Sequence, residues 1–302
     1  MNKSFTLIEI LVVIVIIGIL SGFIIVSMAG VSSKATIAKS QVFANSLRDS
    51  LLMNLVSEWK LDQANNPSTD QTPDSWGANP GTLKEDSYAG ACDVAHCPQL
   101  QTSGCVSGNC FLFDGTNDYI TINSAPENNN KTLEAWFYAY ALSNVRQIAG
   151  DSFDGGAGSQ RGYILRTSGA NVLATIGDGS GTYVEIQTPV SLRTWYHVVL
   201  VHDYDNSKLT LYVNGSKIND AVVTGYTASS NYFVLGKYSG YNAWNFSGLI
   251  DSVLLYNSVP SSSRIQQNYF LGLNELFRGR GVVKDEYIKS LSELKQSLAN
   301  NN

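Results

Sequence analysis

The sequence has few charged residues. Only 15% of its 302 residues are Asp, Glu, Lys or Arg, the formal net charge is −5, and no dense run of Lys and Arg occurs. Without a basic patch, the electrostatic attraction that nucleic-acid binding requires is missing. Gly and Tyr are plentiful instead, with 26 and 16 residues, a composition that suits short strands joined by tight turns. We therefore expect a mainly β protein with no nucleic-acid partner.

The residue patterns that usually carry catalysis are also missing. Glycoside hydrolysis needs two carboxyl groups flanking one bond, and Glu127, Glu134 and Glu185 each stand alone in the sequence. There is no Gly-x-Ser-x-Gly elbow, no phosphate-binding glycine loop and no His-Glu-x-x-His helix. His197 and His202 fall in one predicted strand, so we interpret them as structural. The sequence predicts a protein that is not an enzyme.

Cysteine is scarce and confined to one polar, loop-like stretch, at Cys92, Cys97, Cys105 and Cys110. Two disulfides there would stabilise a segment that buries little apolar surface, and they would indicate an oxidising, extracytoplasmic compartment. Three pairings are open. The alternative is a zinc site that also uses His96, although the spacings lack the short knuckle typical of zinc ligands.

The first residues predict a membrane-spanning segment. Phe5 to Ala29 is apolar apart from Glu9 and a few small or hydroxyl residues. As a helix it would be about 37 Å long, which exceeds the ~30 Å hydrocarbon core of a bilayer. Only four residues precede it, so it looks like a retained anchor rather than a cleaved secretory signal. A carboxylate inside such a segment usually exists for a partner.

The string Lys3-Ser4-Phe5-Thr6-Leu7-Ile8-Glu9 resembles the prepilin cleavage and methylation site of type IV pilins and pseudopilins. The resemblance implies a leader of residues 1–4, cleavage by a prepilin peptidase between Ser4 and Phe5, and methylation of the new amine. Ser4 stands where the family usually has Gly. Glu9 is then the acid that pairs with the N-terminal amine of a neighbouring pilin subunit. The chain would be a single-pass membrane protein with a cytoplasmic N-terminus, its bulk outside, at the cell surface or in a filament.

Apolar residues after the span recur at helical spacing. Ala35, Ala38, Phe43, Leu47, Leu51, Leu55 and Trp59 are separated by polar residues. The pattern predicts one long helix over residues 5–56, made of the membrane span and a stalk.

Strand patterns follow that helix. Nine strands are predicted over residues 119–123, 132–140, 162–167, 172–176, 183–187, 195–202, 208–213, 232–237 and 248–256. Asn214-Gly215 lies between two apolar runs and predicts a type I′ hairpin turn, because both residues tolerate positive φ. The series predicts an antiparallel β-sandwich.

Six strings resemble the laminin G-like, concanavalin A-like jelly roll in their order. They are Trp59-Lys60-Leu61-Asp62, Phe113 to Ile120, Leu133 to Phe137, Trp195 to Val201, Tyr212 to Gly215, and Gly248 to Asn257. The resemblance implies a jelly roll over residues 57–270 with a cysteine-rich insertion at 92–110. Residues 271–302 form a tail in which Val283, Tyr287, Leu291, Leu294 and Leu298 predict a short C-terminal helix.

Two kinds of binding site are expected in this domain. Related jelly rolls often hold a structural calcium ion, and by that resemblance Asp251 would bind it with Asp62, Asp114 or Asp118. The alternative is that Asp114 and Asp118 only fix a turn through backbone hydrogen bonds. The aromatic residues Tyr238, Tyr241 and Trp244, close to Phe246, suit stacking on a sugar or a partner protein, or folding back on the sandwich edge.

These features together predict a minor pilin or pseudopilin that displays a jelly-roll domain for adhesion to carbohydrate or surface ligands. One alternative is a secretion-system pseudopilin whose sandwich binds only partner proteins. Another is a membrane-tethered glycan hydrolase. The fold alone does not choose among them.

Overall fold

The computed structural model describes residues 54–63, 70–86, 92, 96–123, 129–151, 161–226, 228, 233–238 and 244–300. These belong to one unit, Asn54–Asn302. The described residues do not include the predicted membrane span or most of the predicted stalk. They also exclude the predicted processing residues Ser4 and Phe5 and the predicted assembly residue Glu9. None of the helices described reaches the length and hydrophobicity that crossing a bilayer requires.

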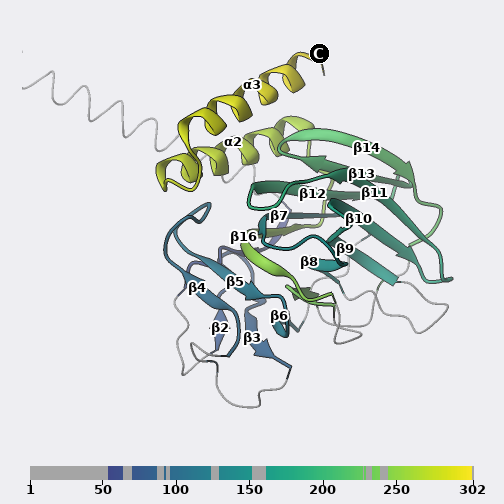
Figure 1. Ribbon diagram of the computed structural model, residues 1–302. Coiled ribbons are helices and arrows are strands. Elements are labelled where there is room, and N and C mark those ends of the chain that lie inside the picture. Colours follow the sequence, from purple (N-terminus) through teal and green to yellow (C-terminus); the bar gives the residue numbers. More distant parts are fainter. Residues whose placement is uncertain are drawn as a thin grey trace, which may run out of the picture. The chain divides into compact units, whose positions relative to one another are not determined.

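The described chain is an antiparallel β-sandwich of two eight-stranded sheets (Figure 1). Sheet 1 has the order β14-β13-β12-β7-β16-β5-β4, and β1 also pairs with β16. Its strands are β1 (Leu55–Trp59), β4 (Gln99–Gln101), β5 (Cys110–Asp114), β7 (Lys131–Ala139), β12 (Trp195–Asp203), β13 (Lys208–Val213), β14 (Ser216–Val222) and β16 (Ser247–Tyr256).

Sheet 2 has the order β11-β10-β9-β8-β15-β6-β3-β2. Its strands are β2 (Gln71–Thr72), β3 (Gly81–Glu85), β6 (Asp118–Ile122), β8 (Arg146–Asp151), β9 (Arg161–Ser168), β10 (Asn171–Asp178), β11 (Tyr183–Pro189) and β15 (Phe233–Leu235). All nine predicted strands are present. The β13–β14 hairpin has its predicted turn, with φ of 50° at Asn214 and 74° at Gly215.

The core lies between the two sheets. Aromatic and aliphatic side chains from both sheets meet there, and Trp59 stacks on Phe233 with ring centroids 5.3 Å apart. In β6 the burial alternates along Asp118–Ile122, as expected for a strand with one covered face. Almost every residue of β7 is buried, because its outer face is covered as well.

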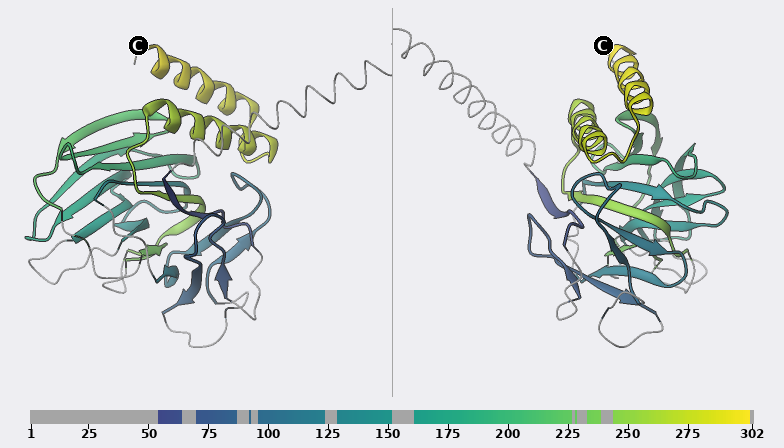
Figure 2. Two further views of the ribbon diagram at one scale, coloured as in Figure 1. Left: turned by 180° about the vertical axis from the view of Figure 1, so that it is seen from behind. Right: turned by 60° about the vertical axis from the view of Figure 1, so that its left-hand side comes forward.

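Two helices cover that outer face of sheet 1. Helix α2 (Ser262–Arg278) and helix α3 (Lys284–Asn300) lie side by side on one flank of the sandwich (Figures 1 and 2). Ser261 caps α2 by accepting a hydrogen bond from the amide of Arg264. Trp136 of β7 stacks on Tyr269 of α2, and Leu273 and Leu276 complete this second apolar cluster.

Two predicted boundaries were wrong. Residues 55 and 56 begin strand β1 rather than end a helix, because Leu55, Ser57 and Trp59 are buried in alternation and the strand pairs with β16. The domain therefore starts at Asn54 instead of residue 57. The predicted boundary between residues 270 and 271 falls inside α2, whose buried residues lie on both sides of it. The predicted C-terminal helix is confirmed as α3.

The cysteines form two disulfides, Cys92–Cys97 and Cys105–Cys110. This settles the pairing, and it excludes the zinc alternative because both bonds consume all four thiols. The Cys105–Cys110 bond packs in the apolar cluster beneath α2.

Candidate functional site

The segment before β16 is fixed in a strained conformation. Trp244 has a φ of +65°, which a bulky residue rarely adopts. Its carbonyl accepts a hydrogen bond from the amide of Gln147 at 2.8 Å, and the carbonyl of Asn245 accepts one from Nη1 of Arg146 at 2.6 Å. The amide of Phe246 donates to the carbonyl of Gly236 at 2.7 Å. These contacts with β8 and the end of β15 hold the backbone of residues 244–246 in place.

The outer face of sheet 2 supports the Trp244 ring. The Tyr238 ring lies 4.5 Å away between centroids, and the Arg166 guanidinium lies 5.3 Å from the Trp244 centroid, a cation–π distance. Arg166 is itself held by an ion pair with Glu185 and by Thr175, whose hydroxyl accepts from Nε at 3.2 Å. Neighbouring strands β9, β10 and β11 thus determine where this tryptophan lies.

An open cleft of about 440 Å³ lies beside Trp244. Its walls combine a cation, two amides and an aromatic ring, and the residues are Gly115, Asn144, Val145, Arg146, Trp244 and Asn245. Such a mixture of one aromatic face and fixed polar groups is typical of small-ligand sites. We call this the Trp244 cleft.

Gly115 keeps one wall of the cleft open. Its φ is +85°, and a Cβ atom there would lie 2.7 Å from Cβ of Ser247 and 3.2 Å from Nη1 of Arg146. Only glycine satisfies both the backbone conformation and the close approach.

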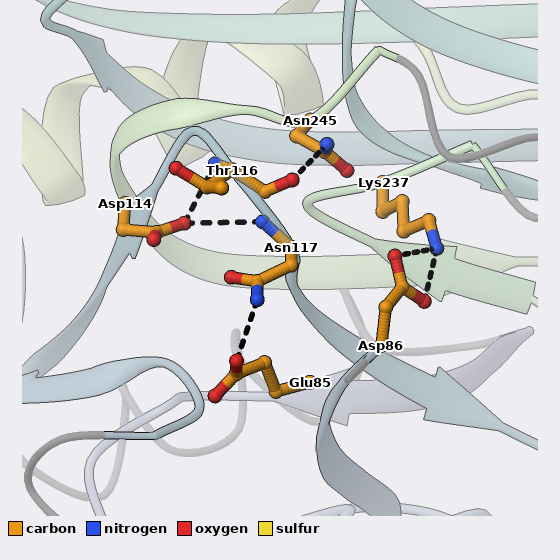
Figure 3. Close-up of polar contacts among 7 residues, drawn as sticks. All are labelled: Glu85, Asp86, Asp114, Thr116, Asn117, Lys237 and Asn245. Carbon is orange, nitrogen blue, oxygen red and sulfur yellow. Dashed lines mark hydrogen bonds and ion pairs between the residues drawn. The ribbon is translucent and has the colours of Figure 1, made fainter. Parts of the chain in front are cut away.

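The turn that carries Gly115 is fixed by side chains (Figure 3). The Asp114 carboxylate accepts hydrogen bonds from the amides of Thr116 at 2.7 Å and Asn117 at 3.3 Å. The Asn117 side chain donates to Glu85, and that of Asn245 donates to the Thr116 carbonyl. Close by, Lys237 forms an ion pair with Asp86 (Figure 3). The two walls of the cleft are therefore tied together through Asn245.

Of the predicted aromatic ligand residues that the structure describes, Trp244 lines the cleft and Tyr238 does not. Tyr238 is buried and supports the Trp244 ring, with Ile164 beneath it. Phe246 is fully buried and packs edge-on against Phe113 and Phe137 in the core. Tyr241 lies outside the described residues.

Sequence reasoning missed Arg146, Asn144 and Gly115. Gly115 belongs to a string that carries the fold resemblance, whereas Arg146 and Asn144 have no local signal in the sequence. Trp244 and Arg146 are about a hundred residues apart in the sequence. They meet because the segment before β16 forms hydrogen bonds with β8.

The four aspartates proposed for calcium do not gather into one site. Asp62 accepts from the amide of Asn109 at 2.7 Å, and Asp251 accepts from the amides of Val106 and Ser107. Asp118 accepts from the amide of Asp114 at 3.0 Å, which is the turn-fixing role given as the alternative. Throughout the described chain, one group of three possible ligands clusters, Cys105, Cys110 and Asp251, and its thiols form a disulfide.

Burial sets the protonation of two of these acids. It raises the pKa of the Asp251 carboxyl to about 8, although Ser252 and two backbone amides donate to it. Burial also raises the pKa of Asp118 to about 7, with further contributions from the charges of Asp114 and Glu85. At pH 7 the Asp251 carboxyl is therefore mostly protonated and the Asp118 carboxyl about half protonated.

The isolated glutamates and histidines are engaged in structural contacts. Glu134 lies buried beneath α2, where it contacts Nε2 of His197 at 2.8 Å and accepts from the Asn268 side chain at 3.0 Å. His202 is buried at the other end of β12, and burial lowers its pKa to about 4. Glu127 lies outside the described residues.

Comparisons with known proteins find a family match for the sandwich and another for the N-terminal segment. Residues 114–266, just over half of it, match the concanavalin A-like lectin/glucanases superfamily. Residues 1–25 match the prokaryotic N-terminal methylation motif, which implies a membrane-anchored, type IV pilin-like protein that a prepilin peptidase processes and that assembles with other pilins. A search of curated proteins finds no match.

Solved structures share the fold at low identity. Domain 4 of AbnA, an extracellular arabinanase from Geobacillus stearothermophilus, solved in complex with arabinotriose, is 18% identical with a TM-score of 0.56, covering 71% of this chain and 97% of that one. The botulinum neurotoxin serotype D binding domain is 16% identical (TM-score 0.54; 73% and 52% covered). The binding domain of Paraclostridial Mosquitocidal Protein 1 is 15% identical (TM-score 0.54; 74% and 53% covered). The alignments thus span about half of the two toxin chains.

At these identities the structural likeness shows the fold alone, whereas the family match covers most of the sandwich, from the turn at Asp114 to the start of α2. The chain therefore belongs to the concanavalin A-like lectin/glucanases superfamily, and it carries a type IV pilin N-terminal methylation segment ahead of that domain.

Proposed function

We propose that this protein is a minor pilin-like subunit whose sandwich binds carbohydrate through the Trp244 cleft and so serves adhesion. The observation that carries the proposal is the placement of Trp244, a strained, half-buried tryptophan locked beside Arg146 and two asparagines. Sugar rings have apolar faces that stack on indole and hydroxyl groups that bond to amide and guanidinium groups. A domain of this fold solved with arabinotriose adds support by analogy.

The pilin-like end supplies the means of display. Processing between Ser4 and Phe5 would leave a helix that enters a filament. Glu9 would then form an ion pair with the new N-terminal amine of a neighbouring pilin subunit. Adhesion then follows from holding a binding domain outside the cell. The membrane anchorage and the assembly are those that the methylation motif implies.

We propose binding rather than catalysis because the candidate carboxylates that the structure describes already have structural partners. Glu134 is closed off beneath α2 with His197, and Glu185 is paired with Arg166. No carboxylate lines the Trp244 cleft among the described residues. Hydrolysis of a glycosidic bond would require two such groups at one site.

A second candidate function is supported by the surface of the helices. Phe270, Leu271 and Phe277 of α2 are 39–58% exposed, as are Ile288 of α3 and, more fully, Val283 just before it. An apolar surface of this kind suits a protein partner, as in a secretion-system pseudopilin. The two functions use different faces and can be tested separately.

The test is a glycan array probed with the full chain in detergent micelles. We expect Trp244→Ala to lose at least tenfold in affinity for the bound glycans, because stacking on the indole is removed. Trp76→Ala is the matched control, since Trp76 is 46% exposed and does not line the cleft. Wild-type binding to no glycan, or equal binding by the Trp244 variant, would refute the proposal and leave the partner-binding candidate.

A further inference from the structure

Arg146 differs from the other partly buried cations near the cleft. Arg166 is paired with Glu185 and Lys237 with Asp86. Arg146 lines the cleft half-buried, and no carboxylate pairs with it within the described chain. Its Nη1 donates to the Asn245 carbonyl, and its Nε is buried without a hydrogen-bond partner. The pKa of this guanidinium is lowered by burial alone, which is consistent with an uncompensated charge.

Nearby acids are committed elsewhere. The Asp114 carboxylate caps its turn through the amides of Thr116 and Asn117, and Glu85 accepts from the Asn117 side chain (Figure 3). A partly desolvated cation without a counter-ion is costly to the unliganded protein. A ligand that carries a negative charge would therefore bind favourably, because it would supply the counter-ion that the guanidinium lacks in the free protein.

The geometry limits which anion fits. The Asn245 carbonyl orients one edge of the Arg146 guanidinium, and this planar group suits a carboxylate. The Trp244 ring in the same cleft suits the apolar face of a sugar, and Asn144 adds amide donors and acceptors. The cleft thus places a cation that can pair with a carboxylate beside an aromatic ring that can stack on a sugar.

Resting on the proposed glycan binding of the same cleft, we propose that the Trp244 cleft selects sugars that bear a carboxylate, and that Arg146 is the residue that determines this specificity. Uronic acids and sialic acids belong to this class. Neutral glycans would still stack on Trp244 and bond to the polar groups of the cleft, but they would bind more weakly because they lack the charge that pairs with Arg146.

The experiment compares acidic oligosaccharides with their methyl esters, which keep the same ring but lose the charge. The full chain in detergent is titrated with each pair by calorimetry, using oligogalacturonate and sialyllactose as probes. We expect at least one acid to bind at least tenfold more tightly than its ester, with a preference that weakens in added salt. Arg146→Met should abolish the preference while leaving ester binding, and Arg146→Lys should retain part of it.

Controls separate this inference from the function on which it depends. Arg193→Met removes an exposed positive charge that does not line the cleft, so it should leave the preference intact. Equal binding of acid and ester by the wild type, with both lost in Trp244→Ala, would overturn the acid selectivity and keep the glycan site. Absence of binding to any glycan would overturn both. The comparison of acid with ester in the wild type needs no variant to fold.

Discussion

Asp251 of β16 binds the backbone amide of Val106, 145 residues earlier in the chain, at 2.7 Å. The amide lies inside the loop closed by the Cys105–Cys110 disulfide, and the same carboxylate oxygen also accepts from Ser107. A fully buried acid thus fixes a covalently closed loop onto the longest strand of sheet 1. This pair makes folding stability depend on pH.

Stability should fall as pH rises from 5 to 8. Burial raises the pKa of Asp251 from 3.8 to about 8, so across this range the folded state holds a proton that the unfolded chain has released. The free energy of unfolding should decline on the order of 4 kcal/mol across this window, because about 1.4 kcal/mol is lost per pH unit while the folded state holds one extra proton. Asp118, with a pKa raised to about 7, adds to the same trend. Denaturant titrations at several pH values measure it.

The variant Asp251→Asn should flatten part of that decline, because its amide mimics the protonated acid and can donate to Ser252. Asp178→Asn is the control. Hydrogen bonds from Thr182 and Ser180 hold the pKa of Asp178 at about 2, so it stays ionised from pH 5 to 8. A slope that is unchanged in Asp251→Asn would show that burial does not hold this proton.

Loss of the Cys105–Cys110 bond should cost stability and also weaken the pH effect. Replacing both cysteines by Ser opens a loop of about six residues, worth about 2 kcal/mol in the chain-entropy picture. Cys92 and Cys97 have the same sequence separation of 5, so their double Ser variant should cost a similar amount. Only the first variant frees the amides that face Asp251. An equal pH slope in both variants would contradict the link.

Gly115→Ala should destabilise the fold and impair the cleft. Two costs combine here, the left-handed backbone and the contact with Ser247. Gly169→Ala separates them, because Gly169 has a φ of +55° with nothing within 4 Å of a Cβ atom. We expect about 1 kcal/mol for Gly169→Ala and at least about 1 kcal/mol more for Gly115→Ala. Similar unfolding midpoints for the two variants would rule out crowding at Gly115.

Helix α2 should be essential to the sandwich. Leu276→Ala removes a fully buried side chain beneath the helix and should cost about 3 kcal/mol. Leu271→Ala, on the same helix but 58% exposed, should change stability by less than about 0.5 kcal/mol. Thermal unfolding followed by tryptophan fluorescence compares them. If both variants behaved alike, α2 would be an appendage rather than a part of the domain.

Replacing Glu9 should separate processing from assembly. With a prepilin peptidase present, we expect both wild type and Glu9→Gln to mature to a chain that begins at N-methylated Phe5, as read by intact mass. Only the wild type should enter filaments, because the neutral side chain cannot pair with a neighbour's amine. Glu275→Gln, an exposed change on α2, should assemble normally. Filaments that contain the Glu9 variant at wild-type levels would contradict this role.

Most strands of the sandwich could be predicted from the sequence, but the boundaries of the domain could not. Val, Ile, Leu and aromatic runs such as β7 and β12 predicted strands, because alternation and branching are local properties. Leu55 and Trp59 satisfied both a helical and a strand period, and pairing with β16 decided between them. Helix α2 has local signals in the sequence, which are a capping residue, Ser261, and apolar residues at helical spacing, Ile265, Tyr269, Leu273 and Leu276. The prediction nevertheless divides the helix, because the resemblance to the jelly roll ends at residue 270.

The candidate site was only partly predictable. Trp244 stood out as one aromatic residue in a glycine- and asparagine-rich loop, but nothing local distinguished it from Tyr238 or Phe246. Their different roles come from the positive φ of Trp244 and from which sheet each side chain faces. Arg146 stands out because no carboxylate pairs with it among the residues that the structure describes. That is a property of the folded domain which no single segment of sequence contains.

The pairing of β1 with β16 has a mechanical consequence. The two strands run antiparallel, with Leu55 beside Tyr256, whereas Trp244 precedes the opposite end of β16. Tension between the anchored N-terminal side of the chain and a ligand held at Trp244 would act along the strand axis. Shear of this kind loads the ladder's hydrogen bonds together instead of unzipping them one at a time. An adhesive subunit built in this way would resist being pulled open by flow at the point where the chain enters the domain.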